Sequence, residues 1–234
     1  KESELMISVL SKLEDSTLHT YFFQCLQREL PIAKLKHLQQ LSSEEWQQLV
    51  ALACKQRAAP LFYKRLQPYQ AQLNMPAAVW QQLELHYYQN AIRNKLISQE
   101  LGELLTLFRQ QQIPVIVLKG ACLANTVYPH PVLRVMLDLD LLLPIETINQ
   151  AVTLLLANGY QPQSALSQVI TDYFTILHHL PPFRRAGSPI TIELHSALAA
   201  PDRFYAVNPE ELWAHAIPLQ LAMGEALSLS VEDL

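Results

Sequence analysis

Cysteine, glycine and basic residues are all scarce in this chain, and each shortage excludes a class of protein. The three cysteines, Cys25, Cys54 and Cys122, are odd in number and far apart, which excludes a disulfide framework and indicates reduced thiols in a cytoplasmic protein. Seventeen Lys and Arg residues against 21 Asp and Glu residues give a net charge of −4, so we expect no broad nucleic-acid binding, which depends on basic surfaces. No apolar run approaches the roughly 20 residues of a membrane-spanning helix, so we expect no membrane partner.

The first half of the chain has the apolar periodicity of helices. Ser42 and Glu45 have the spacing of a capping box, which predicts a helix from there to about Leu66. Pro76 suits a helix start, and the apolar positions after it predict a long helix that ends near Gln111.

After Ile113, short apolar runs alternate with helical patterns, which is typical of a sheet flanked by helices. We therefore predict an α+β protein with a helical domain over 1–111 and an α/β domain over 112–234. Within the second domain, we expect a strand over 173–180 and a hairpin loop over 181–189.

Two aspartates one residue apart, Asp138 and Asp140, are the most informative feature of the chain. Their apolar neighbours predict a strand, in which residues i and i+2 share a face about 7 Å apart while Leu137, Leu139 and Leu141 fill the other face. Two carboxylates at about 5 Å repel each other by roughly 3 kcal/mol at an effective dielectric of about 20, and a divalent cation between them removes that cost. Carboxylate oxygens suit Mg²⁺ or Mn²⁺. A solvated edge strand with two exposed acids is the alternative.

A phosphate-binding turn is predicted upstream of these acids. The apolar run that begins at Ile113 indicates a buried strand, and it ends at Lys119-Gly120 before small, helix-compatible residues that begin with Ala121. A strand, a glycine turn and a helix start place free backbone N–H groups and a positive dipole end at one spot. Lys119 adds a mobile cation there.

A third acid lies on a later strand. Apolar and polar residues alternate before His195, which puts Glu193 and His195 on one face of a predicted strand. Three acids on two adjacent strands near a phosphate-binding turn are what two-metal phosphoryl or nucleotidyl transfer requires, since two ions about 4 Å apart hold the triphosphate and activate the attacking oxygen. A half-exposed strand with ordinary polar residues explains Glu193 and His195 equally well. His178 and His179, on the preceding predicted strand, are interpreted as structural or surface residues.

These motifs follow one another in a recognisable order between about Ile113 and Leu198. They are Leu118-Lys119-Gly120, Tyr128-Pro129, Arg134, Asp138-x-Asp140-Leu141-Leu142, Asn158-Gly159-Tyr160 and Glu193-Leu194-His195. Their order resembles the uncharacterised bacterial nucleotidyltransferase family, a branch of the polymerase-β-like nucleotidyltransferase superfamily. The resemblance implies a mixed β-sheet flanked by helices, with further helices after Leu234.

The resemblance also implies roles for individual residues. Three residues are implied to be catalytic and to hold the metal, namely Asp138, Asp140 and Glu193. Five are implied to contact the nucleotide, namely Lys119, Gly120, Ala121, Arg134 and His195. The superfamily has a serine after the turn glycine, where this chain has Ala121, so Lys119 is expected to compensate.

We therefore predict a Mg²⁺- or Mn²⁺-dependent nucleotidyltransferase that moves a nucleoside monophosphate from an NTP to an acceptor hydroxyl and releases pyrophosphate. The acceptor stays open between a small molecule, a protein side chain and an RNA end. A non-catalytic nucleotide-binding or interaction module of the same fold is the alternative, motivated by Ala121. A metal-dependent hydrolase is a third possibility, but no H-E-x-x-H or H-x-H motif supports it.

Overall fold

The computed structural model describes residues 17–166, 174, 177–199 and 208–233. Contacts divide the chain into two compact units, one of Lys1–Ile92 with Val132–Val135 and one of Arg93–Pro131 with Met136–Leu234. The predicted domains, 1–111 and 112–234, stay a prediction, because this division rests on contacts alone.

The first unit is built from helices. Residues 17–25 are helical, and they are followed by α2 (Ile32–Leu38), α3 (Ser43–Lys55), α4 (Ala59–Leu66), the 3₁₀ helix η1 (Gln67–Gln72) and the first part of α5 (Ala77–Gln110). The predicted capping box is confirmed, since the Ser42 side chain accepts a hydrogen bond from the Glu45 N–H while the Glu45 carboxylate accepts one from the Ser42 N–H.

The prediction of a single helix from 42 to 66 is wrong, because the helix is interrupted between α3 and α4. Arg57 adopts a left-handed backbone with φ of 54°, and Pro60 lies in the first turn of α4. Proline has no N–H to donate to the preceding turn, so a continuous helix cannot pass through it.

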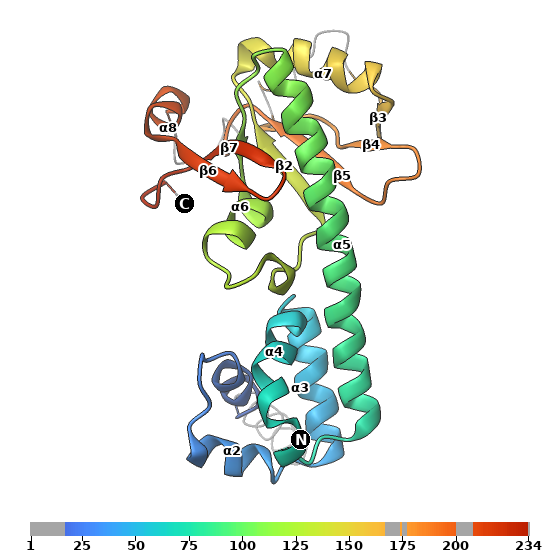
Figure 1. The fold of residues 1–234 in the computed structure, drawn as a ribbon, viewed down its shortest axis with the longest axis vertical. Helices are drawn as coiled ribbons and strands as arrows, with labels where there is room; N and C mark the ends of the chain where they lie inside the picture. The colour runs from blue at the N-terminus through green and yellow to red at the C-terminus, as the bar shows by residue number, and fades with distance from the viewer. Residues whose placement is uncertain (1–16, 167–173, 175–176, 200–207, 234) are drawn as a thin grey trace, which may run out of the picture. The chain divides into compact units, whose positions relative to one another are not determined.

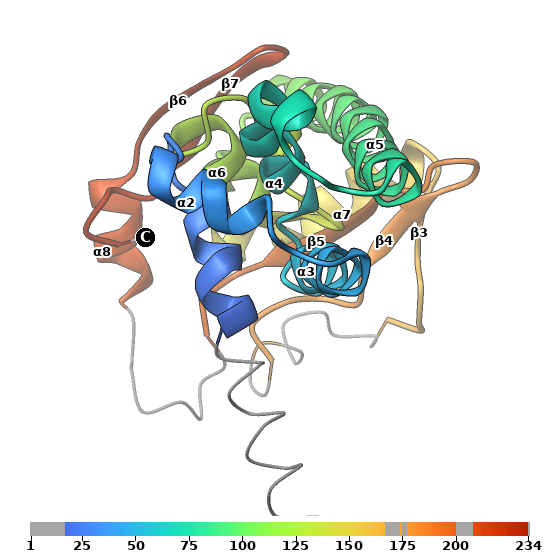
Figure 2. The same ribbon diagram turned by 90° about the horizontal axis from the view of Figure 1, so that it is seen from below.

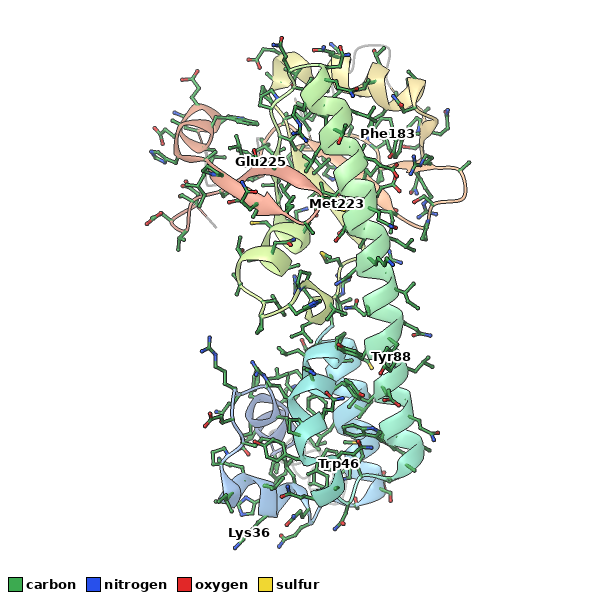
Figure 3. All side chains as sticks on the ribbon, in the orientation of Figure 1. Lys36, Trp46, Tyr88, Phe183, Met223 and Glu225 are labelled. Atoms are coloured by element: carbon green, nitrogen blue, oxygen red, sulfur yellow. The ribbon has the colours of Figure 1, made fainter. Side chains whose placement is uncertain are left out.

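Large apolar side chains form the core of the first unit. Trp46 of α3 and Phe62 of α4 are fully buried, and Figure 3 shows Trp46 inside this group of helices. Tyr63 packs its ring against Trp80 of α5 and donates a hydrogen bond to the Glu84 carboxylate at 2.8 Å. Figure 2 looks nearly along the axis of α3.

The second unit is organised around a seven-stranded mixed sheet with the order β3-β4-β5-β2-β1-β7-β6. The strands are β1 (Ile116–Val117), β2 (Asp138–Leu142), β3 (Tyr160–Pro162), β4 (Phe183–Arg185), β5 (Thr191–His195), β6 (Ile217–Leu221) and β7 (Gly224–Ser228) (Figure 1). Together with the helices, this sheet confirms the predicted α+β class.

The two strands at the centre of the site are parallel neighbours. β2 pairs with β5 so that Asp140 lies opposite Glu193 and Leu142 opposite His195. On the other face, Leu139, Leu141 and Ile192 are completely buried. The period of two along a strand therefore separates a polar face, which carries the acids, from an apolar face.

Helices cover the apolar face. Residues 97–108 of α5 and the buried side of α7 (Ile148–Ala157) share one core with Leu139, Leu141 and Ile192. The remaining helical elements are η2 (Pro131–Leu133), η3 (Ile145–Thr147), α6 (Lys119–Thr126) and α8 (Pro209–His215). Figure 3 shows Met223, in the turn between β6 and β7, against α5, where a Cβ on Gly102 would lie 2.5 Å from the Met223 Cβ.

Predictions for the segments around β2 and β5 were partly wrong. Phe183–Arg185, expected in a loop, form β4, because they pair with β3 and contact Ile192 of β5. Of the strand predicted over 173–180, residues 173, 175 and 176 lie outside the described residues, and among the rest His179 forms a single bridge to His195. Leu137 precedes β2 and is 42% exposed, so it does not fill the apolar face.

The structure describes the cysteines and the apolarity of the helices. Cys25, Cys54 and Cys122 are free thiols, and Cys25 and Cys122 are buried. Within the described part of the chain, no helix combines the length and the apolarity needed to cross a membrane.

Candidate active site

Asp140 is the centre of the polar face and receives two donors on the same oxygen. The Lys119 Nζ lies 2.5 Å from Asp140 Oδ1, and the His195 Nε2 lies 2.9 Å from that atom. Only 3% of the Asp140 side chain is exposed, and only 1% of the His195 side chain. The carboxylate is therefore buried but compensated, which a buried charge requires.

Glu193 joins this pair from the neighbouring strand. Its Oε2 lies 3.5 Å from His195 Nε2, and one-fifth of its side chain is exposed. One ligand atom each from Asp140, Glu193 and His195 lies within 4.8 Å of the others. Two carboxylate oxygens and an imidazole nitrogen are a donor set that fits one divalent cation, with the carboxylates suited to Mg²⁺ or Mn²⁺ and the imidazole to first-row transition ions.

The protonation equilibria of these groups are coupled. Burial alone would raise the pKa of Asp140, but hydrogen bonds from His195 and Lys119 hold it below its ordinary value. The hydrogen bond from His195 likewise lowers the pKa of Glu193, against the effect of burial. Burial would lower the pKa of His195, but its bonds to Asp140 and Glu193 raise it. Asp140 and Glu193 are thus held as carboxylates at neutral pH.

Asp138 lies at the start of β2, on the same face as Asp140. Its side chain is half-buried, and burial followed by repulsion from Asp140 and Glu193 raises its pKa. It does not belong to the group of ligand atoms within 4.8 Å, which contains His195 instead. Its predicted role as a metal ligand stays a prediction.

The start of α6 differs from the predicted glycine turn. The left-handed residue is Lys119, with φ of 46°, and Gly120 is not in the left-handed region. A Cβ on Gly120 would instead lie 3.2 Å from the Met136 Cγ, so close packing against that side chain explains the glycine. Ala121 is buried in the core.

Backbone hydrogen bonds fix this turn beside the acids. The Leu118 N–H donates to the Asp140 carbonyl oxygen at 3.0 Å, which ties the residue before α6 to the middle of β2. N–H groups in the first turn of a helix have no carbonyl partner four residues before them within the helix. The first turn of α6 is therefore held beside β2, the strand that carries Asp140.

The structure assigns Arg134 to the first unit, in the segment Val132–Val135. There its carbonyl oxygen accepts a hydrogen bond from Asn90 Nδ2 at 3.2 Å. Its predicted contact with the nucleotide stays a prediction.

Two further histidines lie against His195, and the sequence analysis gave them no role in the site. The ring centroids of His178 and His179 lie 5.4 and 5.2 Å from that of His195. Burial, followed by the charges of His179 and His195, lowers the pKa of His178. His195 lies two residues after Glu193 on the same strand, so the sequence already placed it on the face of the acids. The contacts of His178 and His179 with His195 come from the pairing of His179 with His195, which the sequence pattern did not predict.

The comparison with protein families agrees with this geometry. Residues 42–234, more than half of the chain, match a family described as uncharacterised nucleotidyltransferase, so the chain belongs to that family. No curated protein and no solved structure matches the chain.

Proposed function

We propose that this member of the uncharacterised nucleotidyltransferase family transfers a nucleoside monophosphate from an NTP to an acceptor hydroxyl and releases pyrophosphate. The observation that supports it most strongly is the buried group of Asp140, Glu193 and His195 on two adjacent parallel strands, beside the first turn of α6. Family membership supports the general reaction class. The acceptor, whether a small molecule, a protein side chain or an RNA end, is not specified by these residues.

A divalent cation fits the group formed by Asp140, Glu193 and His195, with Asp138 on the same face of β2. When bound, such a cation neutralises charge on the triphosphate and lowers the pKa of a coordinated hydroxyl. The residues themselves contribute a rigid frame, because His195 is buried and both strands are held in register by the β2–β5 pairing.

The phosphates are proposed to bind at the start of α6. Free N–H groups and the positive end of the helix dipole favour anions there. Lys119 belongs to this turn, and 55% of its side chain is exposed although its Nζ contacts Asp140. We propose that the ammonium, while it contacts Asp140, also neutralises charge on an incoming phosphate.

Glu193 is proposed to accept the proton of the acceptor hydroxyl. Its lowered pKa keeps it ionised, and its partial exposure leaves Oε2 within reach of a substrate. The acceptor oxygen forms a bond to the α-phosphorus while the bond from the α-phosphorus to the bridging oxygen of the β-phosphate breaks. The electron pair of that bond leaves with pyrophosphate, and the proton remains on Glu193 until solvent removes it.

The test is pyrophosphate release from each of the four NTPs with Mg²⁺ or Mn²⁺, with cell extract as the source of acceptor. Glu193→Gln is the matched inactive variant, since it is nearly isosteric. The proposal expects metal-dependent release by the wild type that exceeds release by Glu193→Gln at least 100-fold.

A non-catalytic nucleotide-binding module is the alternative, and Ala121 is the observation that favours it. Alanine has no hydroxyl, and this side chain is buried in the core, so residue 121 cannot donate a hydrogen bond to a phosphate through its side chain. Equal pyrophosphate release by both proteins, together with measurable NTP binding, would establish this alternative.

A further inference from the structure

Lys119 has an unusual backbone conformation. Its φ of 46° lies in the left-handed region, which residues with a Cβ rarely adopt outside Asn and Asp. Such conformations persist where the surrounding structure holds them, and they are common at functional sites. Here the neighbouring residue, Leu118, is fixed to β2 by its hydrogen bond to the Asp140 carbonyl oxygen.

The side chain of Lys119 turns its charge inward. Although the side chain as a whole is 55% exposed, its Nζ lies 2.5 Å from Oδ1 of Asp140, whose side chain is 3% exposed. A surface lysine usually keeps its ammonium in water. This ammonium is instead the cation of a buried carboxylate.

The same oxygen is also a candidate metal ligand. Asp140 Oδ1 already receives Lys119 Nζ and His195 Nε2. A two-ion site needs carboxylates that serve both ions, about 4 Å apart. The described residues supply one compact ligand group, Asp140 with Glu193 and His195, and Asp138 lies outside it.

We propose that the Lys119 ammonium takes the place of a second metal ion, so that the site binds one divalent cation per chain. With His195 neutral, as a metal ligand must be, one divalent ion and one ammonium carry three positive charges, which match the three carboxylates of Asp138, Asp140 and Glu193. This inference deepens the proposed function, on which it rests for the role of the nucleotide, but the number of ions can be measured without catalysis.

The first test is a calorimetric titration of the metal-free protein with Mn²⁺ alone. The wild type is expected to bind one ion. Lys119→Met is expected to bind Mn²⁺ at least threefold more tightly, because a competing positive charge is removed. Lys119→Arg keeps the charge and is expected to resemble the wild type. Lys95→Met, which removes an exposed lysine of α5, is the matched control and is expected to change nothing.

Lys119→Asn is a second uncharged variant, used in case Lys119→Met does not fold. Asparagine tolerates the left-handed backbone and has no charge, so it is expected to show the same increase in Mn²⁺ affinity. Far-ultraviolet circular dichroism identifies the variants that are folded.

The second test counts the ions with nucleotide present. Electron paramagnetic resonance of the wild type with saturating Mn²⁺ and each of the four α,β-methylene NTPs is expected to show an isolated ion. A spectrum of two coupled ions, or an unchanged or weaker Mn²⁺ affinity in folded Lys119→Met and Lys119→Asn, overturns the inference and leaves the proposed function intact. A wild type that binds no Mn²⁺ under any of these conditions contradicts both.

Discussion

Two buried carboxylates of the second unit, Glu100 and Asp140, have opposite surroundings. Glu100 accepts a hydrogen bond from the Tyr160 hydroxyl on Oε1 at 2.5 Å, and bonds from Arg185 Nη2 and Ser188 Oγ on Oε2, each at 3.2 Å. Both of its oxygens are thus satisfied by fixed partners from other elements. Glu100 ties α5 to β3, β4 and the turn after β4.

Asp140 has two donors on one oxygen and two further acids beside it. Lys119 and His195 both use Oδ1, while Asp138 and Glu193 add negative charge to the same face. A saturated carboxylate such as Glu100 is structural, whereas a cluster with more acids than cations favours an added cation. Glu100→Gln is therefore the natural control for substitutions at the acids of β2 and β5.

The largest difference is expected in turnover. Glu193→Gln should lower pyrophosphate release at least 100-fold while NTP affinity changes only a few-fold, because the carboxylate is needed for the chemistry more than for binding. Glu100→Gln should retain turnover per folded molecule. Steady-state rates beside a binding titration measure this. A Glu193→Gln enzyme with wild-type turnover would remove Glu193 from the mechanism.

The second difference is expected in metal affinity and stability. Asp140→Asn should weaken Mn²⁺ binding at least tenfold, whereas Glu100→Gln should leave it unchanged; calorimetry measures both.

Without metal, Asp140→Asn should also destabilise the protein, by about 1–3 kcal/mol, because His195 and Lys119 lose a charged partner. Repulsion between Asp138 and Asp140 alone predicts the opposite sign. Urea unfolding in EDTA distinguishes the two, and a more stable Asp140→Asn would show that repulsion dominates.

A third effect is expected at the start of α6. Gly120→Val should weaken NTP affinity about tenfold, because a side chain there obstructs the approach of phosphate. The same side chain also meets Met136, so the double variant Gly120→Val with Met136→Ala is needed to separate the two effects. Calorimetry that shows full recovery of affinity in the double variant would assign the loss to internal packing instead of phosphate.

The smallest effect is expected in the pH dependence of stability. The pKa of His195 is raised in the folded protein from its ordinary value of 6.5. The stabilisation of the folded state by protonated His195 is therefore complete below pH 6.5 and is lost as the pH rises through the folded pKa. In EDTA, the free energy of unfolding of the wild type should therefore fall more than that of His195→Gln as the pH rises above 6.5. His37→Gln, at an exposed position of α2, should follow the wild type. Parallel curves for wild type and His195→Gln in urea unfolding would contradict the coupling.

The sequence predicted those features that depend on local pattern. The alternation around Asp138, Asp140 and Glu193 indicated two strands with acids on one face, because strand periodicity is a local property. The conformation of Lys119 could not be predicted in this way, since a glycine beside it was the more common choice for a left-handed residue. The packing of Gly120 against Met136, the bond between Lys119 and Asp140, and the role of Glu100 depend on contacts between distant residues.

The measurement that tests the account most directly is anomalous X-ray diffraction at the manganese edge from crystals of the wild type grown with Mn²⁺. The account predicts a peak within bonding distance of Asp140, Glu193 and His195, which disappears in Asp140→Asn and persists in Glu100→Gln. A peak at another place in the chain, or none at these residues with Mn²⁺ at millimolar concentration, would contradict the assignment of this group as the metal site.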